Sequence, residues 1–154
     1  MKKRNALVIF LLLNLLFMFF YSAQPVRSLT PGTIYILPDG TIEGTDKIQK
    51  NGNTYVFTEN ITVAIINQTI EIPNIVIQRD NIVVDGQGFA LLGPGPNLVD
   101  GITISNGHNI TIRNLLIEDF RYGVFLNESC TNNTISENAL INNSIELWKS
   151  SCHS

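Results

Sequence analysis

Asparagine side chains are the residues of this chain whose type and spacing most directly suggest chemistry. Six of them begin an Asn-x-Ser/Thr triplet without proline, which is the acceptor sequence for N-glycosylation. They are Asn60, Asn67, Asn109, Asn127, Asn132 and Asn142. Asn109 and Asn132 also fit a purely structural role in a repeated turn, so the other four are the better candidates for carrying a glycan.

Charged side chains form two loose groups. The first contains three carboxylates and two guanidinium groups, from Asp80, Asp85, Asp100, Arg79 and Arg113. The second contains Asp119 and Arg121. Such groups can bind a cation or move a proton. Scattered charges between strands are more often solvated turn residues, and Asp85-Gly86 is typical of a tight turn. The sequence therefore favours structural roles for both groups.

Residues 1–23 have the composition of an export signal. Basic residues at positions 2–4 precede an apolar run from Ala6 to Tyr21, and Ser22-Ala23 offers small residues for cleavage. The sequence thus predicts a secreted or cell-surface protein. An uncleaved segment would instead act as a signal anchor, and membrane contact is expected only in that case.

The charge balance excludes some classes of partner. Removal of residues 1–23 takes away three of the 10 basic residues and none of the 13 acidic ones, so the net charge changes from −3 to −6. A mildly acidic surface without a basic stripe argues against binding to nucleic acid or to anionic lipid. The remaining length suits one domain, and its many Ile and Val residues favour strands.

Two short apolar patterns recur along the chain with nearly the same period. Gly101–Ile104 returns as Gly123–Leu126, and it returns again as Ser144–Leu147. Independently, Asn109–Ile112 returns as Asn132–Ile135. Interleaved repeats with a common period, here about 22 residues, are typical of a solenoid, and an antiparallel meander does not produce them.

These repeats predict an all-β fold, namely a right-handed parallel β-helix of about three to four turns with an N-terminal β lead-in. Residues 24–68 would form the lead-in or cap, and residues 69–154 the repeats, as a coil truncated at its C-terminus. Equivalent strands would lie roughly 4.8 Å apart. We expect Ile112 directly below Ile135 and Val124 below Ile145, with Thr111 facing solvent.

The corners between strands should use residues that tolerate left-handed backbone conformations, which are Asn and Gly. Stacked Asn side chains can also satisfy one another's amide groups along the coil, and this is the structural role that Asn109 and Asn132 fit. The expected corners contain Asn114, Asn138, Gly86, Gly88 and Gly123.

The two cysteines, Cys130 and Cys152, are separated in sequence by one coil period. In a continuing coil their Cα atoms would be separated by roughly the 4.8 Å strand spacing, a distance that a disulfide accepts. Such a bridge would fasten the last turn outside the cytoplasm. The alternative is a frayed end with two unrelated thiols.

Several motifs resemble a known group of proteins. Tyr122–Leu126 and Asn132–Asn138, together with the pattern Asn-x-Thr-Ile-x-Asn, resemble the parallel β-helix repeats of NosD-like and pectate-lyase-like surface proteins, and Gly32–Ile48 resembles the lead-in of secreted members. The resemblance implies a coil over residues 32–147 and leaves the activity open. We expect an exported module with a structural or carbohydrate-binding role, not demonstrably catalytic, whose partner is a polysaccharide or another cell-surface protein.

The resemblance also implies two alternatives. Lyases of this fold hold Ca²⁺ against an acidic sugar with clustered carboxylates while a basic residue abstracts the proton. A fragment or subunit of a polysaccharide lyase or hydrolase would use Asp80, Asp85 and Asp100, with Arg79 or Arg113 as the base. A NosD-like role in metal-site maturation would need soft ligands. After the signal these are His108, His153, Cys130 and Cys152. The sequence favours neither alternative and predicts no cofactor and no metal.

Overall fold

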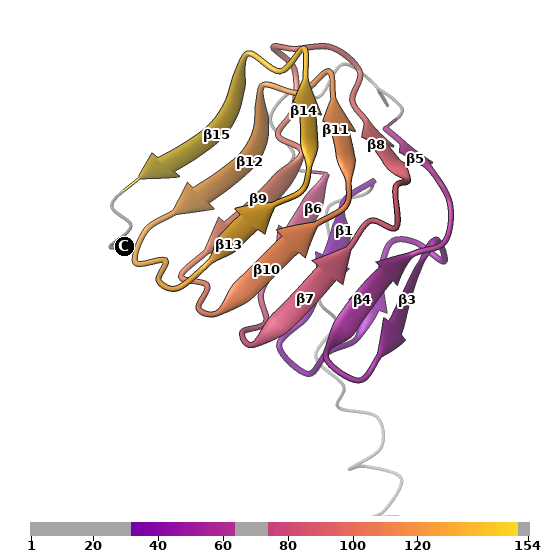
Figure 1. Cartoon of the computed structure of the whole chain (residues 1–154), viewed down its shortest axis with the longest axis vertical. Coiled ribbons are helices and arrows are strands. Elements are labelled where there is room, and N and C mark those ends of the chain that lie inside the picture. Colours follow the sequence, from indigo (N-terminus) through magenta and orange to yellow (C-terminus); the bar gives the residue numbers. More distant parts are fainter. Residues whose placement is uncertain (1–31, 64–73, 151–154) are drawn as a thin grey trace, which may run out of the picture.

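The computed structural model describes residues 32–63 and 74–150, and all of their regular secondary structure is β-strand (Figure 1). The predicted export signal lies outside these residues. No helix in the described part of the chain is long and apolar enough to cross a membrane. The expectation of an all-β fold is confirmed.

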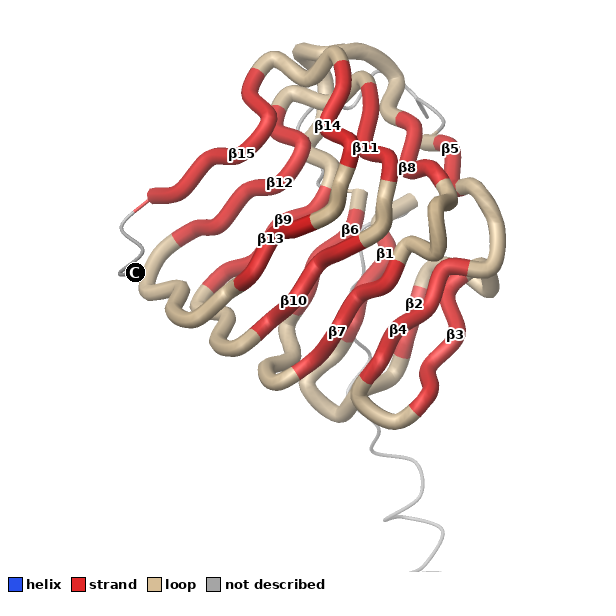
Figure 2. The backbone as a smooth tube through the Cα atoms, viewed as in Figure 1, coloured by secondary structure: helices blue, strands red, loops and turns tan. Residues whose placement is uncertain are grey.

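The strands form three sheets, here called A, B and C, that run along the coil (Figures 1 and 2). Sheet A contains β15 (Ile145–Ser150), β12 (Tyr122–Asn127), β9 (Ile102–Ser105), β6 (Ile75–Ile77), β1 (Ile34–Ile36) and β2 (Ile42–Glu43). Sheet B contains β13 (Thr134–Ser136), β10 (Ile110–Arg113), β7 (Ile82–Asp85), β4 (Thr54–Phe57) and β3 (Ile48–Asn51). Sheet C contains β14 (Ala139–Ile141), β11 (Leu116–Glu118), β8 (Ala90–Leu92) and β5 (Ile61–Thr62).

Successive strands along the chain from β6 onward enter sheets A, B and C in turn, and each pairs in parallel with its equivalent in the next coil. This arrangement is a parallel β-helix, as predicted. Among the described strands only β2 and β3 pair antiparallel, with β1 and β4 at the N-terminal end of the coil.

The corners repeat as regularly as the strands. The residues with positive φ in one coil include Asn109 (55°), Asn114 (54°) and Asp119 (65°). Their equivalents in the next coil also have positive φ, and these are Asn132 (55°), Glu137 (57°) and Asn142 (52°). Asn114 and Gly88 (82°) therefore lie at left-handed corners, as expected. In the last coil the left-handed residue is Glu137, and the predicted Asn138 follows it.

Other glycines are required for close approach between coils. A Cβ on Gly86 would collide with the backbone of Asn114 and Leu115 in the next coil. A Cβ on Gly123 would lie 2.7 Å from the carbonyl oxygen of Glu146. Neither has positive φ, so packing and not backbone conformation explains the glycine at these two positions.

The core lies inside the coil and consists mainly of stacked columns of Ile, Val and Leu. Ile112 pairs with Ile135, and Thr111 beside it is half-buried on the outer face, so this predicted register is confirmed. The predicted pairing of Val124 with Ile145 is wrong, because Val124 pairs with Leu147. In all three sheets, paired residues of the last two coils are separated by the same number of residues along the chain. The apolar pattern had suggested a smaller separation in sheet A, and this is why the predicted pairing was wrong.

Candidate functional site

One outward-facing column of sheet A carries aromatic side chains. In register from coil to coil it contains Tyr35, Val76, Thr103, Phe125 and Trp148. The rings of Tyr122 and Phe125 stack with their centroids 5.2 Å apart, and the Tyr122 and Trp148 centroids are 6.1 Å apart. Trp148 is 45% exposed and the other two rings are half-buried. We call Tyr122, Phe125 and Trp148 the aromatic face.

A buried ion pair orients the aromatic face. The guanidinium of Arg121 donates from Nε to one oxygen of Asp100 at 2.8 Å and from an Nη to the other at 3.0 Å. The Asp100 side chain is only 8% exposed. The same guanidinium lies 5.2 Å from the centre of the Tyr122 ring, within the range of a cation–π interaction. Asp100 therefore positions Arg121, and Arg121 positions Tyr122.

Polar side chains border the aromatic face. Ser105, Asn127 and Ser150 occupy equivalent outward positions in successive coils, two residues beyond the aromatic column. Within the column, the hydroxyl of Thr103 is buried and has no hydrogen-bond partner. Flat rings beside amide and hydroxyl groups can bind a ligand that has both apolar faces and hydroxyl groups.

Asp85 is a buried carboxylate that pairs with the exposed Arg113 at the corner between sheets B and C. Its carboxylate accepts hydrogen bonds from the Gln87 backbone at 3.0 Å, from Arg113 Nε at 2.9 Å and from Asn114 Nδ2 at 3.2 Å. Burial alone would raise the pKa of Asp85, but these hydrogen bonds and the Arg113 charge outweigh it and lower the pKa below its usual value. This pair joins two coils and holds the corner in place.

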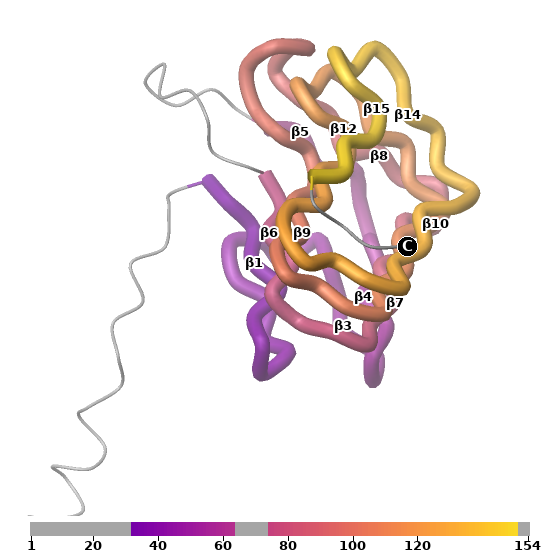
Figure 3. Tube along the Cα trace, turned by 90° about the vertical axis from the view of Figure 1, so that its left-hand side faces the viewer, coloured from indigo at the N-terminus to yellow at the C-terminus, as the bar shows by residue number. Residues whose placement is uncertain are grey.

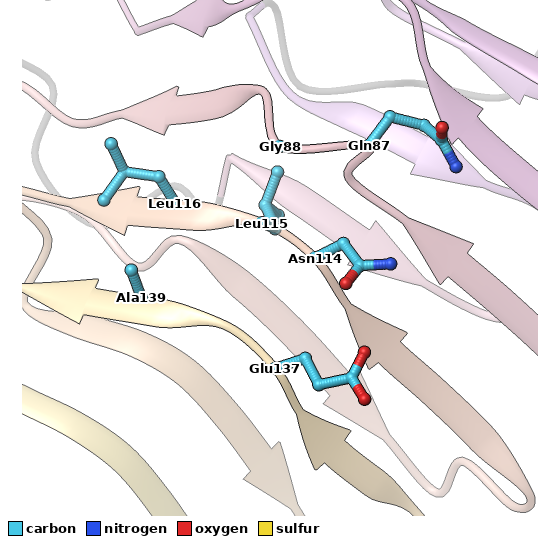
Figure 4. Close-up of a pocket in the computed structure, with 7 residues that line it drawn as sticks. All are labelled: Gln87, Gly88, Asn114, Leu115, Leu116, Glu137 and Ala139. Atoms are coloured by element: carbon cyan, nitrogen blue, oxygen red, sulfur yellow. The ribbon is translucent and has the colours of Figure 1, made fainter.

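An open groove of about 480 Å³ follows the same corner (Figure 4). Gln87, Asn114 and Glu137, from three successive coils, form its polar side, and Leu116 and Ala139 form its apolar side. The three polar residues are the left-handed corner residues of their coils. The groove is therefore a consequence of the repeat, and no buried unpartnered group among the described residues points to a ligand in it.

The structure does not bring the predicted carboxylates together. Asp80 lies between β6 and β7, Asp85 at the end of β7, and Asp100 between β8 and β9, so each is at a different corner. Arg79 and Asp80 line one cavity, of about 440 Å³. The second predicted group is also divided, since Arg121 pairs with Asp100 while Asp119 accepts from Asn142 Nδ2.

The two soft-ligand candidates among the described residues differ in exposure. Cys130 is buried, with its Sγ 3.2 Å from the Asn127 carbonyl oxygen. His108 is exposed, and its Nδ1 lies 2.7 Å from Thr131 Oγ1 on the outside. Cys152 and His153 lie outside the described residues, so the proposed disulfide stays a prediction.

The glycosylation candidates occupy different settings. Asn109 donates from Nδ2 to Asn81 Oδ1 at 2.9 Å, along the column of corner residues that continues with Asn132. Asn60 is exposed and accepts from the Ala90 backbone at 2.9 Å. Asn127 is half-buried at the border of the aromatic face, and Asn142 donates to Asp119. Asn67 lies outside the described residues.

The aromatic face was not found from the sequence. Its signal is the spacing between Phe125 and Trp148, which equals the spacing between paired residues of the last two coils in sheets B and C. The shorter spacing that the apolar pattern suggested placed Phe125 opposite Glu146 and concealed the pair. The true spacing would also have shown that three asparagines share one role. Each side chain accepts a hydrogen bond from a backbone amide of the preceding coil, and these residues are Asn133, Asn138 and Asn143.

Comparison with known proteins gives one finding. A family model described as the periplasmic copper-binding protein NosD matches residues 38–152. No curated protein and no solved structure matches the chain.

Proposed function

Since the chain belongs to the NosD family of periplasmic parallel β-helix proteins, we propose that it is an exported module that binds polysaccharide on the aromatic face of sheet A. The family description indicates an extracytoplasmic location, in agreement with the predicted export signal. The parallel β-helix supplies a rigid surface on which side chains repeat at the strand spacing.

The family description also names copper, and the described residues do not fit a copper site. Copper prefers thioether, thiolate and imidazole ligands. Both methionines, Met1 and Met18, lie outside the described residues. Cys130 is buried, whereas His108 is exposed and lies beside Thr131. No group of three or more His, Cys, Asp or Glu side chains within residues 32–63 and 74–150 could hold a metal ion. No copper chemistry is therefore assigned to this coil.

The aromatic face is the observation that carries the proposal. Exposed Trp148 and half-buried Phe125 lie on adjacent strands, about 4.8 Å apart along the coil axis. Their ring faces offer flat apolar contact area at low conformational cost. A sugar chain that runs along the axis would place successive rings over Phe125 and Trp148 and its hydroxyl groups beside Asn127.

Solvent exposure favours binding over a purely structural role. Large exposed apolar groups that are bordered by polar residues mark interaction sites. Arg121 and Asp100 hold Tyr122 in place although Tyr122 is not part of the buried core. A ring held in a fixed position lowers the conformational cost of binding a ligand.

Substitution of the rings tests the proposal. Neutral oligosaccharides of four to six units can be titrated calorimetrically against the wild type, Trp148→Ala and Phe125→Ala. We expect each variant to bind about tenfold more weakly, which is the effect of one lost aromatic contact. Ile141→Ala is the matched control, because Ile141 is 47% exposed but lies on sheet C. Unchanged affinity in both ring variants, or binding of a cell-surface protein in place of sugars, would contradict the proposal.

A further inference from the structure

Arg79 differs from the other two arginines in the described part of the chain. Arg113 and Arg121 each bind a buried aspartate. Arg79 forms no ion pair among the described residues and makes two long hydrogen bonds, both at 3.4 Å, to the Pro38 carbonyl oxygen and to Asn53 Oδ1. Its Nε is buried without a partner. A guanidinium has five donors in a planar fork, so most of the hydrogen-bonding capacity of Arg79 is unused.

The cavity beside Arg79 can receive a small group. It has a volume of about 440 Å³ and lies at the corner between sheets A and B. Its lining is almost entirely polar and consists of Pro38, Asn53, Gln78, Arg79, Asp80 and Asn81. One oxygen of the Asp80 carboxylate in this lining is used within the coil, because Oδ1 accepts from the His108 backbone at 2.8 Å. Arg79 supplies the positive charge of this lining.

A second cation lies next to Arg79. The Nζ of Lys50 and an Nη of Arg79 both lie so close to Gly40 that a Cβ on this residue would collide with both. Gly40 has φ of 87°, and its carbonyl oxygen accepts from the buried Tyr55 hydroxyl at 3.0 Å. Burial raises the pKa of Tyr55 despite the opposing charge of Arg79, and the charge of Asp39 acts in the same direction as burial, so the phenol stays a donor. Two like charges held over one fixed glycine favour an anion between them.

We propose that this cavity binds a carboxylate of the polysaccharide, which is therefore an acidic, uronate-containing one. A carboxylate accepts two parallel hydrogen bonds from an arginine, and such charge-assisted pairs are about twice as strong as neutral ones. The unsatisfied Arg79 fork and the nearby Lys50 supply these donors. This inference rests on the proposed function, because it takes polysaccharide as the ligand. The residues that support it are not those of the aromatic face.

The two sites are within reach of one chain of sugars. Arg79 lies two residues beyond the end of β6 and three beyond Val76, the β6 member of the aromatic column, so the Cα atoms of Val76 and Arg79 are at most about 10 Å apart. Trp148 lies three strands away from β6, or about 14 Å along the coil. A polysaccharide several units long can therefore cross the aromatic face and place one carboxylate in the cavity.

The experiment compares two ligands of the same shape. Tetragalacturonate and its fully methyl-esterified, neutral form are titrated against the wild-type protein and Arg79→Gln. We expect the wild type to bind the acid about tenfold more tightly than the ester. Arg79→Gln should lose this preference while its affinity for the ester stays unchanged. Lys47→Gln is the control, because it removes the same charge from an exposed lysine that pairs with Glu59 away from the cavity.

Other outcomes separate this inference from the proposed function. Equal binding of acid and ester by the wild type, or a preference that survives in Arg79→Gln, would overturn the carboxylate site. Lys50→Gln should reduce the preference partly, and it tests the site independently if Arg79→Gln does not fold. If Trp148→Ala leaves both affinities unchanged while Arg79→Gln abolishes the preference, the carboxylate site in the cavity is supported and polysaccharide binding on the aromatic face is contradicted. Binding of free galacturonate as tight as that of the tetramer would show a small-anion site and overturn its assignment to a polysaccharide.

Discussion

The two ends of the coil are built differently. At the N-terminal end, β2 and β3 pair antiparallel with β1 and β4, so two of the three sheets end in a strand that runs against the others. At the other end, β13, β14 and β15 each pair on one side only among the described residues. Figure 3 looks onto this last coil, which lies nearest to the viewer.

The same inward column has opposite burial at the two ends. Ile34 is 4% exposed, Ile102 in the middle is fully buried, and Leu147 is 37% exposed. All three occupy one column of sheet A in register. An apolar side chain in a solenoid becomes core only when a neighbouring coil covers it on each side. Stacking therefore decides burial, and residue type alone does not.

The last coil is held by hydrogen bonds where the inner coils use apolar packing. Asn138 accepts from the Leu115 backbone at 3.0 Å and donates to the Ile112 carbonyl oxygen at 2.9 Å. Asn133 and Asn143 make the same two contacts at the neighbouring corners. One coil earlier these positions are occupied by fully buried apolar residues, Ile110, Leu115 and Phe120.

The largest expected effect contrasts two positions of one inward column. Ile102→Ala removes a fully buried side chain and should lower the free energy of unfolding by about 2–5 kcal/mol. Leu147→Ala removes a side chain that is 37% exposed and should lower it by about 1 kcal/mol or less. Urea unfolding of the two variants measures the difference. Equal losses would mean that Leu147 is covered as completely as Ile102, and the contrast between the regions would fail.

A smaller effect is expected at the hydrogen bonds of the last coil. Asn138→Ala removes two part-buried hydrogen bonds, to the Leu115 amide and to the Ile112 carbonyl oxygen, and should lower the free energy of unfolding by about 1–3 kcal/mol in total. Hydrogen exchange of the Leu115 amide should accelerate as well. Thr134→Ala, at an exposed position of the same coil, is the control and should change stability by less than about 0.5 kcal/mol. If Asn138→Ala behaves like this control, packing alone holds the last coil.

The sequence allowed the coil to be predicted where the pattern is unambiguous. In sheet B, a Thr-Ile pair follows an Asn corner in both coils, so the pairing of Ile112 with Ile135 could be predicted from the spacing. In sheet A the true register places Lys149 opposite the buried Leu126. A comparison based on apolar residues excludes the pairing of Leu126 with Lys149. The shorter spacing was preferred because it pairs more apolar residues with one another. A charged residue at the last inward position thus defeats prediction by pattern.

The candidate site was less predictable than the fold. Asp85 and Arg113 are 28 residues apart, whereas Asp100 and Arg121 are 21 apart, because the connections between strands differ in length from coil to coil. No single sequence period therefore predicts both aspartate–arginine ion pairs. Only stacking in three dimensions shows that Arg79 lacks the buried carboxylate that the other two described arginines have.

The smallest effect is expected on acidification, and it separates the inner coils from the last one. The folded-state pKa of Asp85 is lowered, so its contribution to stability is complete above the usual carboxyl pKa of about 4 and is lost as the pH falls through the folded-state value. The asparagine contacts of the last coil do not titrate. We therefore expect the melting temperature of the wild type to decrease as the pH drops below about 4. Asp85→Asn should have a lower melting temperature than the wild type at neutral pH, and its melting temperature should decrease less on acidification. Melting scans from pH 7 to 3 measure this, with Asp46→Asn, at an exposed position, as the control. The change is small because an amide at position 85 still offers an oxygen to Arg113 and Asn114. If the melting temperature of Asp85→Asn decreases on acidification as much as that of the wild type, other carboxylates cause the acid sensitivity of the inner coils.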